Sequence, residues 1–493
     1  MYLCRKIKAC FMGNIIGREQ ETDELNELYE SGRAEFVAVY GRRRVGKTFL
    51  VDEALKGKIT FRHSGLSPVD EQNHKNSLKE QLKHFYLSLQ RHGMKKSKCP
   101  ASWLEAFFML EMHLQSLDNG SRQVVFLDEL PWMDTPRSGF VTALEAFWNG
   151  WACHRDNMML VVCGSANSWM LDNLVNNHGG LYGRTTYEVK LSPFSLAECE
   201  AFFESKGIRM SRYDIVQSYM ITGGIPYYLG YMKRGLSLAQ NVDRLFFARG
   251  AKLHDEYDRL FASVFANPEQ MKRVVQLLGT RHSGYTRQEI FAKTGLKDCG
   301  ASTKLLKALV ASDFIEPYIP FGKGKREKHY KLIDHFCLFY MKFVQGQKDI
   351  DPEFWMHNVT SQGVSSWRGF AFEEVCFSHI SKIKKALDIL GVSSMESAWV
   401  VKGDDETEGA QIDLLINRKD NVVNLCEMKF YNEKFTVNKA YYSKVVHQQN
   451  LLAERIPRRA VVHNVLVTTE GLTYNEYSGV FQKVVTIDDL FVK

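Results

Sequence analysis

The 493-residue chain lacks the cysteine patterns of a disulfide scaffold or a zinc site. Its ten cysteines include no C-x-x-C pair and follow no even ladder of spacings. Cysteines used in this way are typical of a reducing compartment, where thiols stay free and mostly buried. This usage argues against a small secreted protein and favours the cytoplasm.

Long apolar runs are also missing. No stretch reaches the roughly 18 residues that a membrane span needs. Residues 1–12 carry three basic residues, but the apolar piece that follows them is too short for a secretory signal. Organised sequence begins only at Ile15, so Met12 is a candidate for the true start. We therefore expect a cytoplasmic protein with no membrane partner.

Charge of one sign is not in large excess, and no internal repeat or low-complexity tract is present. The net charge is +7, the apolar fraction is 45% and the charged fraction is 25%. These values are typical of an ordinary globular protein. A mild basic excess permits a nucleic-acid partner without arguing for one. The length suggests roughly three or four domains.

What is present is organised around residues 41–48, which read Gly-Arg-Arg-Arg-Val-Gly-Lys-Thr. They fit G-x-x-x-x-G-K-[ST], the P-loop, in its required context: the apolar run 36–40 predicts a buried strand before it, and 49–51 predicts a helix after it. The glycines let backbone N–H groups face phosphates at a helix N-terminus. Lys47 would reach the β- and γ-phosphates of ATP, and Thr48 would ligate Mg²⁺. The predicted nucleotide-binding residues of this stretch are Gly41, Arg42, Arg43, Arg44, Val45, Gly46, Lys47, Thr48 and Phe49.

A second landmark is the apolar strand 124–127, which ends in Asp128 and Glu129. Asp128 would hold Mg²⁺, directly or through water, and Glu129 would polarise the attacking water. A strand ending in two acids is common, but this one lies about 80 residues after a P-loop, and both motifs must meet at the carboxyl ends of parallel strands. The pattern predicts a P-loop ATPase with a parallel sheet. Between the two motifs, residues 52–120 read as mostly helical and polar.

Further along, two positions carry open alternatives. An apolar strand is followed by Ser165 and Asn167, either of which could contact the γ-phosphate or the water, or simply cap the next helix. Arg184 follows a turn and could act as an arginine finger or sensor, or could be an exposed structural arginine. The alternation of strands and helices stops near residue 192, and 195–262 predicts a helical lid.

Five motifs occur in a fixed order: the P-loop, Leu-Asp-Glu-Leu-Pro-Trp-Met, Cys-Gly-Ser-Ala-Asn-Ser-Trp-Met, Leu-Tyr-Gly-Arg and Gly-Gly-Ile-Pro-Tyr-Tyr-Leu. Over residues 15–260 the chain therefore resembles the archaeal-type AAA ATPase family of prokaryotes, which is related to AAA+ and STAND ATPases. The resemblance implies that Pro226, in the last motif, contacts the nucleotide. It also gives Arg184 weight as a sensor or finger.

Residues 266–345 predict a winged helix. A capping box at 286–289 opens a short helix, a second helix follows at 302–311, and two β-like runs then flank a basic turn. The span 322–331 holds five basic residues and one acid, which indicates contact with nucleic acid. A winged helix used as a protein joint, with its wing merely solvated, is the alternative.

The last third of the chain carries acids on adjacent predicted strands. Glu427 and Lys429 lie two positions apart in one strand, so they project to the same side, and hairpin pairing can bring Asp413 of the preceding strand beside them. Two carboxylates bind a divalent cation and a nearby lysine can orient water, as phosphodiester hydrolysis requires. Glu373 or Glu374, on a predicted helix upstream, could complete the metal site.

The order helix-Glu, strand-Asp, strand-Glu-x-Lys resembles the PD-(D/E)XK nuclease superfamily, and the domain of unknown function that often follows this ATPase. The resemblance covers residues 350–493, with Ile412 in place of the family's proline. The catalytic set that it implies is Asp413, Glu427 and Lys429, with Glu373 as a fourth member. A nuclease fold kept only for binding is the alternative. Gln448 and Gln449, on the following helix, are candidates for DNA contact.

The sequence as a whole predicts an α/β protein of four parts: a P-loop ATPase core at 15–192, a helical lid at 193–265, a winged helix at 266–345 and a restriction-endonuclease-like domain at 350–493. The predicted function is an ATP-binding and ATP-hydrolysing switch that acts on DNA, with a nuclease dependent on Mg²⁺ or Mn²⁺. A regulator that binds DNA or protein without cleavage is the first alternative. A mechanical remodeller, which needs a ring and an arginine acting in trans, is the second. Whether the protein forms a homo-oligomer stays open.

Overall fold

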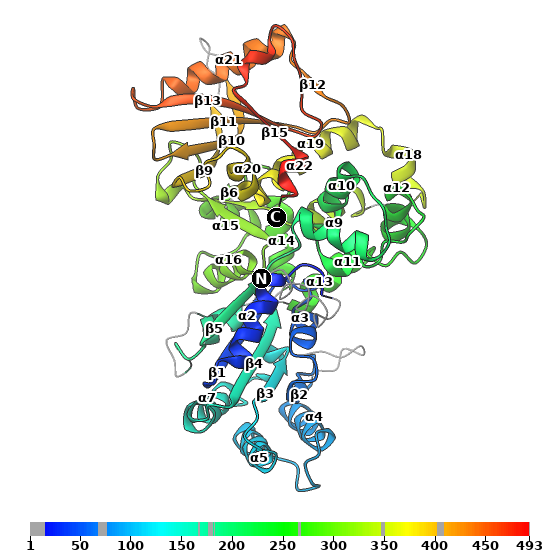
Figure 1. Ribbon diagram of the computed structural model, residues 1–493, viewed down its shortest axis with the longest axis vertical. Coiled ribbons are helices and arrows are strands. Elements are labelled where there is room, and N and C mark those ends of the chain that lie inside the picture. The colour runs from blue at the N-terminus through cyan, green and yellow to red at the C-terminus, as the bar shows by residue number, and fades with distance from the viewer. Residues whose placement is uncertain are drawn as a thin grey trace, which may run out of the picture. The chain divides into compact units, whose positions relative to one another are not determined.

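The computed structural model describes residues 15–67, 76–165, 168–175, 181, 183–264, 268–346, 351–401 and 409–492, and Figure 1 labels many of their helices and strands. The chain divides into two compact units. The first contains the described residues of Met1–Ser192, Leu260–Pro268 and Gly300–Asp313, and the second contains those of Pro193–Arg259, Glu269–Cys299 and Phe314–Lys493. The first boundary between the units, after Ser192, coincides with the end of the ATPase core predicted from the sequence. Met12 and Asn167 lie outside the described residues.

The first unit is built on a five-stranded parallel sheet with the order β2-β3-β4-β1-β5. The strands are β1 (Glu35–Gly41), β2 (Ile59–Ser64), β3 (Gln123–Asp128), β4 (Met158–Ser165) and β5 (Tyr187–Leu191). The three central strands are buried along nearly their whole length. Strands covered on both faces need apolar side chains on both sides, which is why these three stand out in the sequence as continuous apolar runs. The predicted parallel sheet is confirmed.

The two outer strands of this sheet, β2 and β5, are not evident from the sequence. β2 lies within 52–120, where Arg62 and His63 interrupt the apolar pattern. β5 alternates exposed and buried residues over only five positions. An edge strand pairs on one side only and tolerates polar side chains, so it leaves a weak signal. Most of the other described residues of 52–120 are helical, as predicted, chiefly in Leu78–Arg91 and Trp103–Ser116.

Helices pack on the sheet of the first unit through an aromatic core. They are α2 (Glu19–Glu30), α3 (Lys47–Ala54), α4 (Leu78–Arg91), α5 (Trp103–Ser116), α6 (Leu130–Met133), α7 (Phe140–Gly150), α8 (Ser168–Met170) and α16 (Gly300–Ala311). Trp103 of α5 has its ring centroid 5.5 Å from that of Phe85 in α4 and 4.9 Å from that of Phe140 in α7. These three rings are buried. They fix α4 and α5 against the rest of the core.

The second unit begins with the predicted lid, which is helical. Its helices are α9 (Leu196–Ser205), α10 (Arg212–Thr222), α11 (Pro226–Leu229), α12 (Leu238–Val242) and α13 (Glu256–Val264), the last of which crosses into the first unit. Further helices of this unit are α14 (Pro268–Leu278), α15 (Arg287–Thr294), α17 (His335–Phe343), α18 (Phe354–Asn358), α19 (Gln362–Ser378) and α20 (Ile380–Ala386). No described helix is long and apolar enough to cross a membrane.

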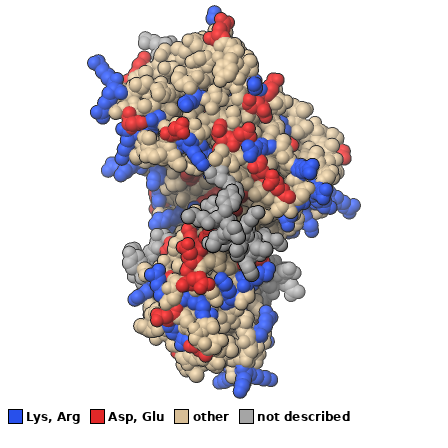
Figure 2. Space-filling view, in the orientation of Figure 1, with Lys and Arg blue, Asp and Glu red and all other residues tan. Residues whose placement is uncertain are grey.

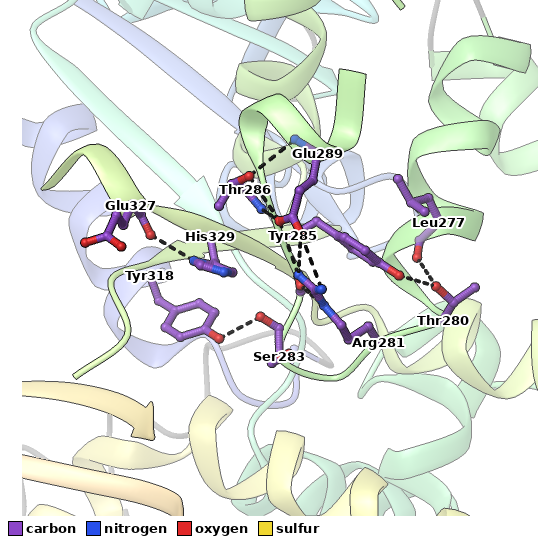
Figure 3. Close-up of polar contacts among 11 residues, drawn as sticks. Leu277, Thr280, Arg281, Ser283, Tyr285, Thr286, Glu289, Tyr318, Glu327 and His329 are labelled. Carbon is purple, nitrogen blue, oxygen red and sulfur yellow. Dashed lines mark hydrogen bonds and ion pairs between the residues drawn. The ribbon is translucent and has the colours of Figure 1, made fainter. Parts of the chain in front are cut away.

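The local elements of the predicted winged helix are present. β6 (Tyr285–Thr286), β7 (Ile315–Tyr318) and β8 (His329–Leu332) form an antiparallel sheet with the order β6-β8-β7. The predicted capping box opens α15: Glu289 accepts the backbone N–H of Thr286 at 2.8 Å and the guanidinium of Arg281 at 3.3 Å (Figure 3). Tyr318 donates its hydroxyl to the Ser283 carbonyl at 2.7 Å, which ties β7 to the loop before β6 (Figure 3). The second predicted helix, α16, belongs to the first unit.

The last part of the second unit is a mixed five-stranded sheet with the order β15-β13-β11-β10-β9. Its strands are β9 (Ser394–Val401), β10 (Ala410–Arg418), β11 (Val422–Lys429), β13 (Val461–Thr468) and β15 (Lys483–Thr486). A separate two-stranded sheet is formed by β12 (Phe435–Thr436) and β14 (Leu472–Thr473), and the helices of this part are α21 (Lys439–Ala453) and α22 (Ile487–Leu490). β9, β10 and β11 are antiparallel, whereas β11, β13 and β15 are parallel. The predicted hairpin of β10 and β11 is confirmed.

Candidate functional site

Residues 41–48 turn tightly from β1 into α3. Gly41, Arg44 and Gly46 have positive φ angles of 154°, 72° and 92°. At Gly41 only glycine fits, because a Cβ atom would lie 2.1 Å from the carbonyl oxygen of Leu191. Gly46 is left-handed and caps the N-terminus of α3. The loop therefore ends on an α-helix N-terminus, whose free N–H groups attract phosphate.

The lysine of this loop lies against the loop's own backbone. Lys47 is 6% exposed, and its ammonium donates to the carbonyl oxygens of Gly41 at 3.3 Å and Arg42 at 3.1 Å. Arg42 is buried, whereas Phe49, one residue past the motif, is 51% exposed. The positive charge of Lys47 is thus held at the turn where the phosphates of a nucleotide would lie.

The P-loop and the strand that ends in two acids meet through their side chains. Thr48 Oγ1 donates to Asp128 Oδ2 at 3.0 Å, although 80 residues separate them. Mg²⁺ takes oxygen ligands at about 2.0–2.1 Å in octahedral geometry, which places neighbouring ligand atoms about 3.0 Å apart. The two oxygens therefore fit adjacent positions around this cation, and Thr48 and Asp128 are the residues that would hold it.

Glu129 stands beside this pair in a strained backbone conformation. Its φ and ψ are 48° and 46°, and its N–H donates to Asp128 Oδ1 at 3.0 Å. Burial raises the pKa of the Glu129 carboxyl, Lys47 opposes this shift and the Asp128 charge adds to it. A raised pKa makes a carboxylate a better proton acceptor near neutral pH. The arrangement suits a residue that polarises water.

Of the other predicted nucleotide-binding residues, only Ser165 is shown to lie beside the P-loop. Ser165 is buried at the end of β4, paired with Gly41, so it lies beside the P-loop. Pro226 is the first residue of α11 in the second unit, and its contact with a nucleotide stays a prediction. Asn167 lies outside the described residues.

Arg184 is not brought to the P-loop of its own chain. It is exposed and precedes β5, whose first residue Tyr187 pairs with Val37 near the start of β1. Because β1 and β5 are parallel, Arg184 lies at the amino ends of the strands, while the P-loop follows their carboxyl ends. About six residues of strand lie between the level of Arg184 and that of the P-loop, which corresponds to about 20 Å along the strand. The sequence does not reveal this, because it does not show which end of a sheet a turn occupies.

The second unit brings the predicted nuclease residues together. Asp413 on β10 and Glu427 on β11 are opposite one another, one step beyond the paired residues Leu414 and Cys426. Lys429 Nζ lies 3.9 Å from Asp413 Oδ2 and 3.5 Å from Glu427 Oε2. Burial alone would lower the pKa of Lys429, but the surrounding carboxylates outweigh it and raise that pKa. The lysine is therefore held charged between the two acids.

Protein donors contact both oxygens of Glu427, and its role as a metal ligand stays a prediction. Oε2 accepts from Tyr441 at 2.6 Å and Lys444 at 3.1 Å, and Oε1 accepts from Gln448 at 2.9 Å. Burial opposes ionisation of Glu427, but Lys429 and these donors outweigh it and lower its pKa. Within the part of the chain that the structure describes, no three His, Cys, Asp or Glu side chains gather closely enough to hold a metal ion.

The donors to Glu427 were missed by the sequence reasoning or assigned elsewhere. Tyr441, Lys444 and Gln448 share one face of α21, at a spacing of three and four residues, and that spacing is the signal that could have found them. Gln448 is buried and donates to the Gln411 carbonyl and to Glu427, and its contact with DNA stays a prediction. Gln449 likewise accepts from Asn464 at 2.7 Å.

Glu373 and Asp413 line a shared pocket of about 410 Å³. Burial raises the pKa of Glu373 to about 8, and the Asp413 charge adds to the shift. Burial also raises the pKa of Asp413, with Glu427 adding. Two acids that discourage each other's ionisation would gain from a cation between them.

The basic turn of the predicted wing is exposed, but it presents four basic side chains and not the five counted in the sequence. Lys323, Lys325, Arg326 and Lys328 are exposed. Lys331 is instead buried in an ion pair with Glu374 at 3.2 Å, so it does not belong to the basic surface. Figure 2 shows cationic and anionic side chains interspersed on the face drawn, as the mild net charge implies.

Comparison with known proteins finds similarity that begins in the first unit and extends into the second. Residues 15–232 match the model of a family described as an ATPase domain predominantly from Archaea. An uncharacterized protein of Methanocaldococcus jannaschii is 25% identical over 445 residues, which cover 89% of this chain and 92% of that protein.

Two solved structures align over much of the chain. The Walker-type ATPase of Pyrococcus abyssi has a TM-score of 0.47 and 19% identity, covering 67% of this chain and 96% of its own. The ORC2 protein of Aeropyrum pernix has a TM-score of 0.41 and 13% identity, covering 67% and 95%. Residues 15–232 are thus similar to an ATPase domain found predominantly in Archaea, and the P-loop geometry of the first unit agrees with that similarity.

Proposed function

We propose that the first unit binds ATP with Mg²⁺ and hydrolyses it as a molecular switch. The observation that carries this proposal is the 3.0 Å bond between Thr48 Oγ1 and Asp128 Oδ2, which pairs two oxygen ligands beside Lys47. The bound cation would offset the charge of the phosphates. Lys47 would hold the β- and γ-phosphates, and Glu129 would orient the attacking water.

Titration calorimetry with ATP, with and without Mg²⁺, tests nucleotide binding. We expect Lys47→Ala to weaken ATP binding by about 100-fold or more, because a charge-assisted contact with phosphate is lost. Lys56→Ala, a lysine with a 71% exposed side chain just past α3, is the matched control and should bind as the wild type does. Equal affinity of Lys47→Ala and wild type would refute the assignment of the site.

We propose a second activity, metal-dependent hydrolysis of phosphodiester bonds, for the second unit. Its support is the pair Glu373 and Asp413 in one pocket, with Lys429 within 3.9 Å of Asp413. Mg²⁺ is often held by one or two carboxylates while substrate phosphate and water complete its shell, so a third protein ligand is not required. Glu427 would then position Lys429 rather than bind the metal.

Incubation of plasmid and single-stranded DNA with Mg²⁺ or Mn²⁺, with and without ATP, tests this second activity. We expect cleavage by the wild type, at least about 100-fold less cleavage by Lys429→Ala and Asp413→Asn, and no change in Lys439→Ala, an exposed lysine on α21. Cleavage at the wild-type rate in both Lys429→Ala and Asp413→Asn would refute the assignment of this site. Hydrolysis of ATP without any cleavage would favour the alternative, a regulator with an inactive nuclease-like domain.

We propose DNA as the substrate on the strength of the four exposed cations of the turn between β7 and β8. Fluorescence anisotropy with a short duplex at several salt concentrations measures their contribution. If Lys325 and Arg326 each contact a phosphate, the double variant Lys325→Glu/Arg326→Glu should reduce the salt slope by about 2. Lys95→Glu/Lys96→Glu, in an exposed loop of the first unit, is the control. An unchanged slope would favour a wing that serves as a protein joint.

The proposal of a mechanical remodeller rests on Arg184 acting on a neighbouring copy. Its exposure and its distance from the P-loop of its own chain are compatible with a role in trans. Light scattering with ATP should then show a homo-oligomer for the wild type and a smaller species for Arg184→Ala. A monomer in both samples would leave Arg184 as a structural residue.

A further inference from the structure

Glu129 has a backbone conformation that its own sequence does not favour. A non-glycine residue at φ 48° costs roughly 1–3 kcal/mol and persists only where its surroundings hold it. Within the turn, Trp132 N–H donates to the Glu129 carbonyl at 2.9 Å, and Pro131 stands at the start of α6. These features lie within the turn itself, so a contact from a neighbouring element is also needed to hold the Glu129 backbone in place.

The buried side chain of Gln81 on α4 supplies that support. Its Nε2 donates to the carbonyl oxygens of Trp132 at 2.8 Å and Leu66 at 2.9 Å, and its Oε1 accepts the N–H of Leu66 at 3.1 Å. Gln81 has no exposed surface. One amide thus joins three backbone groups, one on the turn that follows Glu129 and two on the segment that follows β2.

The segment after β2 is pressed directly against the same turn. Gly65 N–H donates to the Asp128 carbonyl at 3.0 Å. A Cβ atom at Gly65 would lie 2.9 Å from the Glu129 carbonyl oxygen and 3.1 Å from Trp132 Cβ. Movement of Leu66 or Trp132 would therefore move the backbone of Glu129. Gln81 is the side chain that bonds to both Leu66 and Trp132.

We propose that Gln81 is a positioning residue for ATP hydrolysis: it fixes the Glu129 turn against α4 and the segment after β2, and so sets where the Glu129 carboxylate meets the attacking water. It does not touch the P-loop through any of these bonds, so it acts on the hydrolytic step and not on nucleotide binding. A misplacement of about 1 Å in a catalytic group can cost about 100-fold in rate. The inference rests on the proposed hydrolysis of ATP by this site.

The test compares kcat, KM and nucleotide affinity in full-length variants. Gln81→Met keeps the length and apolar volume of the side chain but none of its three bonds. We expect its kcat to fall about 10- to 100-fold, while the Kd for ATP measured by calorimetry stays within about twofold. Ser88→Ala is the matched control. Ser88 is buried on the same helix and bonds to His63 at 2.9 Å, away from the turn, so its kcat should not change.

Gln81→Glu separates positioning from general stability. Its ionised carboxylate would face two carbonyl oxygens and repel them, whereas the protonated acid can donate one of the lost bonds. Activity of Gln81→Glu relative to wild type should therefore rise as pH falls, and that of Gln81→Met should not. A kcat of Gln81→Met within twofold of wild type would overturn the proposal, as would parallel losses of kcat, ATP affinity and unfolding temperature. A wild type that hydrolyses no ATP would instead refute the proposed function.

Discussion

Two buried histidines in the second unit should make its stability depend on pH. His379 lies at the end of α19, where its Nδ1 donates to the Val375 carbonyl at 2.8 Å and its Nε2 accepts the N–H of Leu196 at 3.1 Å. Burial lowers the pKa of His379 to about 4. Burial also lowers the pKa of His335 to about 4, and the nearby His379 adds to that shift. Protonation of His379 at Nε2 would replace the acceptor of the Leu196 amide by a second donor.

The sign of the effect follows from where protons bind. An unfolded histidine has a pKa near 6.5. Between pH 6.5 and pH 4, these two histidines therefore bind protons in the unfolded chain but not in the folded chain. The stabilisation is complete above pH 6.5 and is lost as the pH falls toward 4. For a shift from 6.5 to 4, the loss between pH 7 and pH 5 is about 2 kcal/mol for each histidine, which corresponds to about a 30-fold change in an opening equilibrium.

Hydrogen exchange of the Leu196 amide is the direct assay, because that amide donates to His379. After correction for intrinsic exchange rates, we expect protection of Leu196 to fall at least about 30-fold from pH 7 to pH 5, which is the share due to His379 alone. In His379→Gln the part of this fall due to His379 should vanish. His463→Gln, at an exposed position of β13, should behave as the wild type does. Equal protection at both pH values in the wild type, or an unchanged fall in His379→Gln, would refute the reasoning.

Three further sets of substitutions have defined outcomes. Gly41→Ala places Cβ 2.1 Å from the Leu191 carbonyl, so strain of about 1–3 kcal/mol should lower the unfolding temperature by several degrees and weaken ATP binding, which calorimetry and thermal scans measure. Lys331→Met leaves Glu374 buried without its cation and should cost about 3–5 kcal/mol in urea unfolding of the second unit, which Glu374→Leu in the same chain should largely restore. Thr48→Ser should keep Mg²⁺-dependent ATP binding within about threefold, whereas Thr48→Val should lose about tenfold or more, because only serine retains the hydroxyl ligand.

The sequence predicts those parts of the fold in which local pattern and burial agree. The strand before the P-loop and the strand before Asp128 are both central, so their apolar runs are long and uninterrupted. The capping box at Thr286 is a local signal and forms as expected. The strands β2 and β5 are not predicted from the sequence, because edge strands need apolar residues at fewer positions.

The site is predictable in its residue types but not in their roles. The spacing of Glu427 and Lys429 correctly places them on one face of a strand. It does not show that α21 covers that face and occupies the oxygens of Glu427 with donors. Arg184 shows the same limit, since its turn precedes a strand that the sequence does not reveal. In both cases the missing information is a long-range contact, which local periodicity does not contain.

Steady-state release of phosphate from ATP by the full-length protein tests the central claim most directly. The wild type should release phosphate in a Mg²⁺-dependent reaction. Glu129→Gln should bind ATP with an affinity similar to that of the wild type, because Lys47, Thr48 and Asp128 are untouched, but should release phosphate at least about 100-fold more slowly. Phosphate release by Glu129→Gln at the wild-type rate, or none by a wild type that binds Mg²⁺ and ATP, would contradict the account.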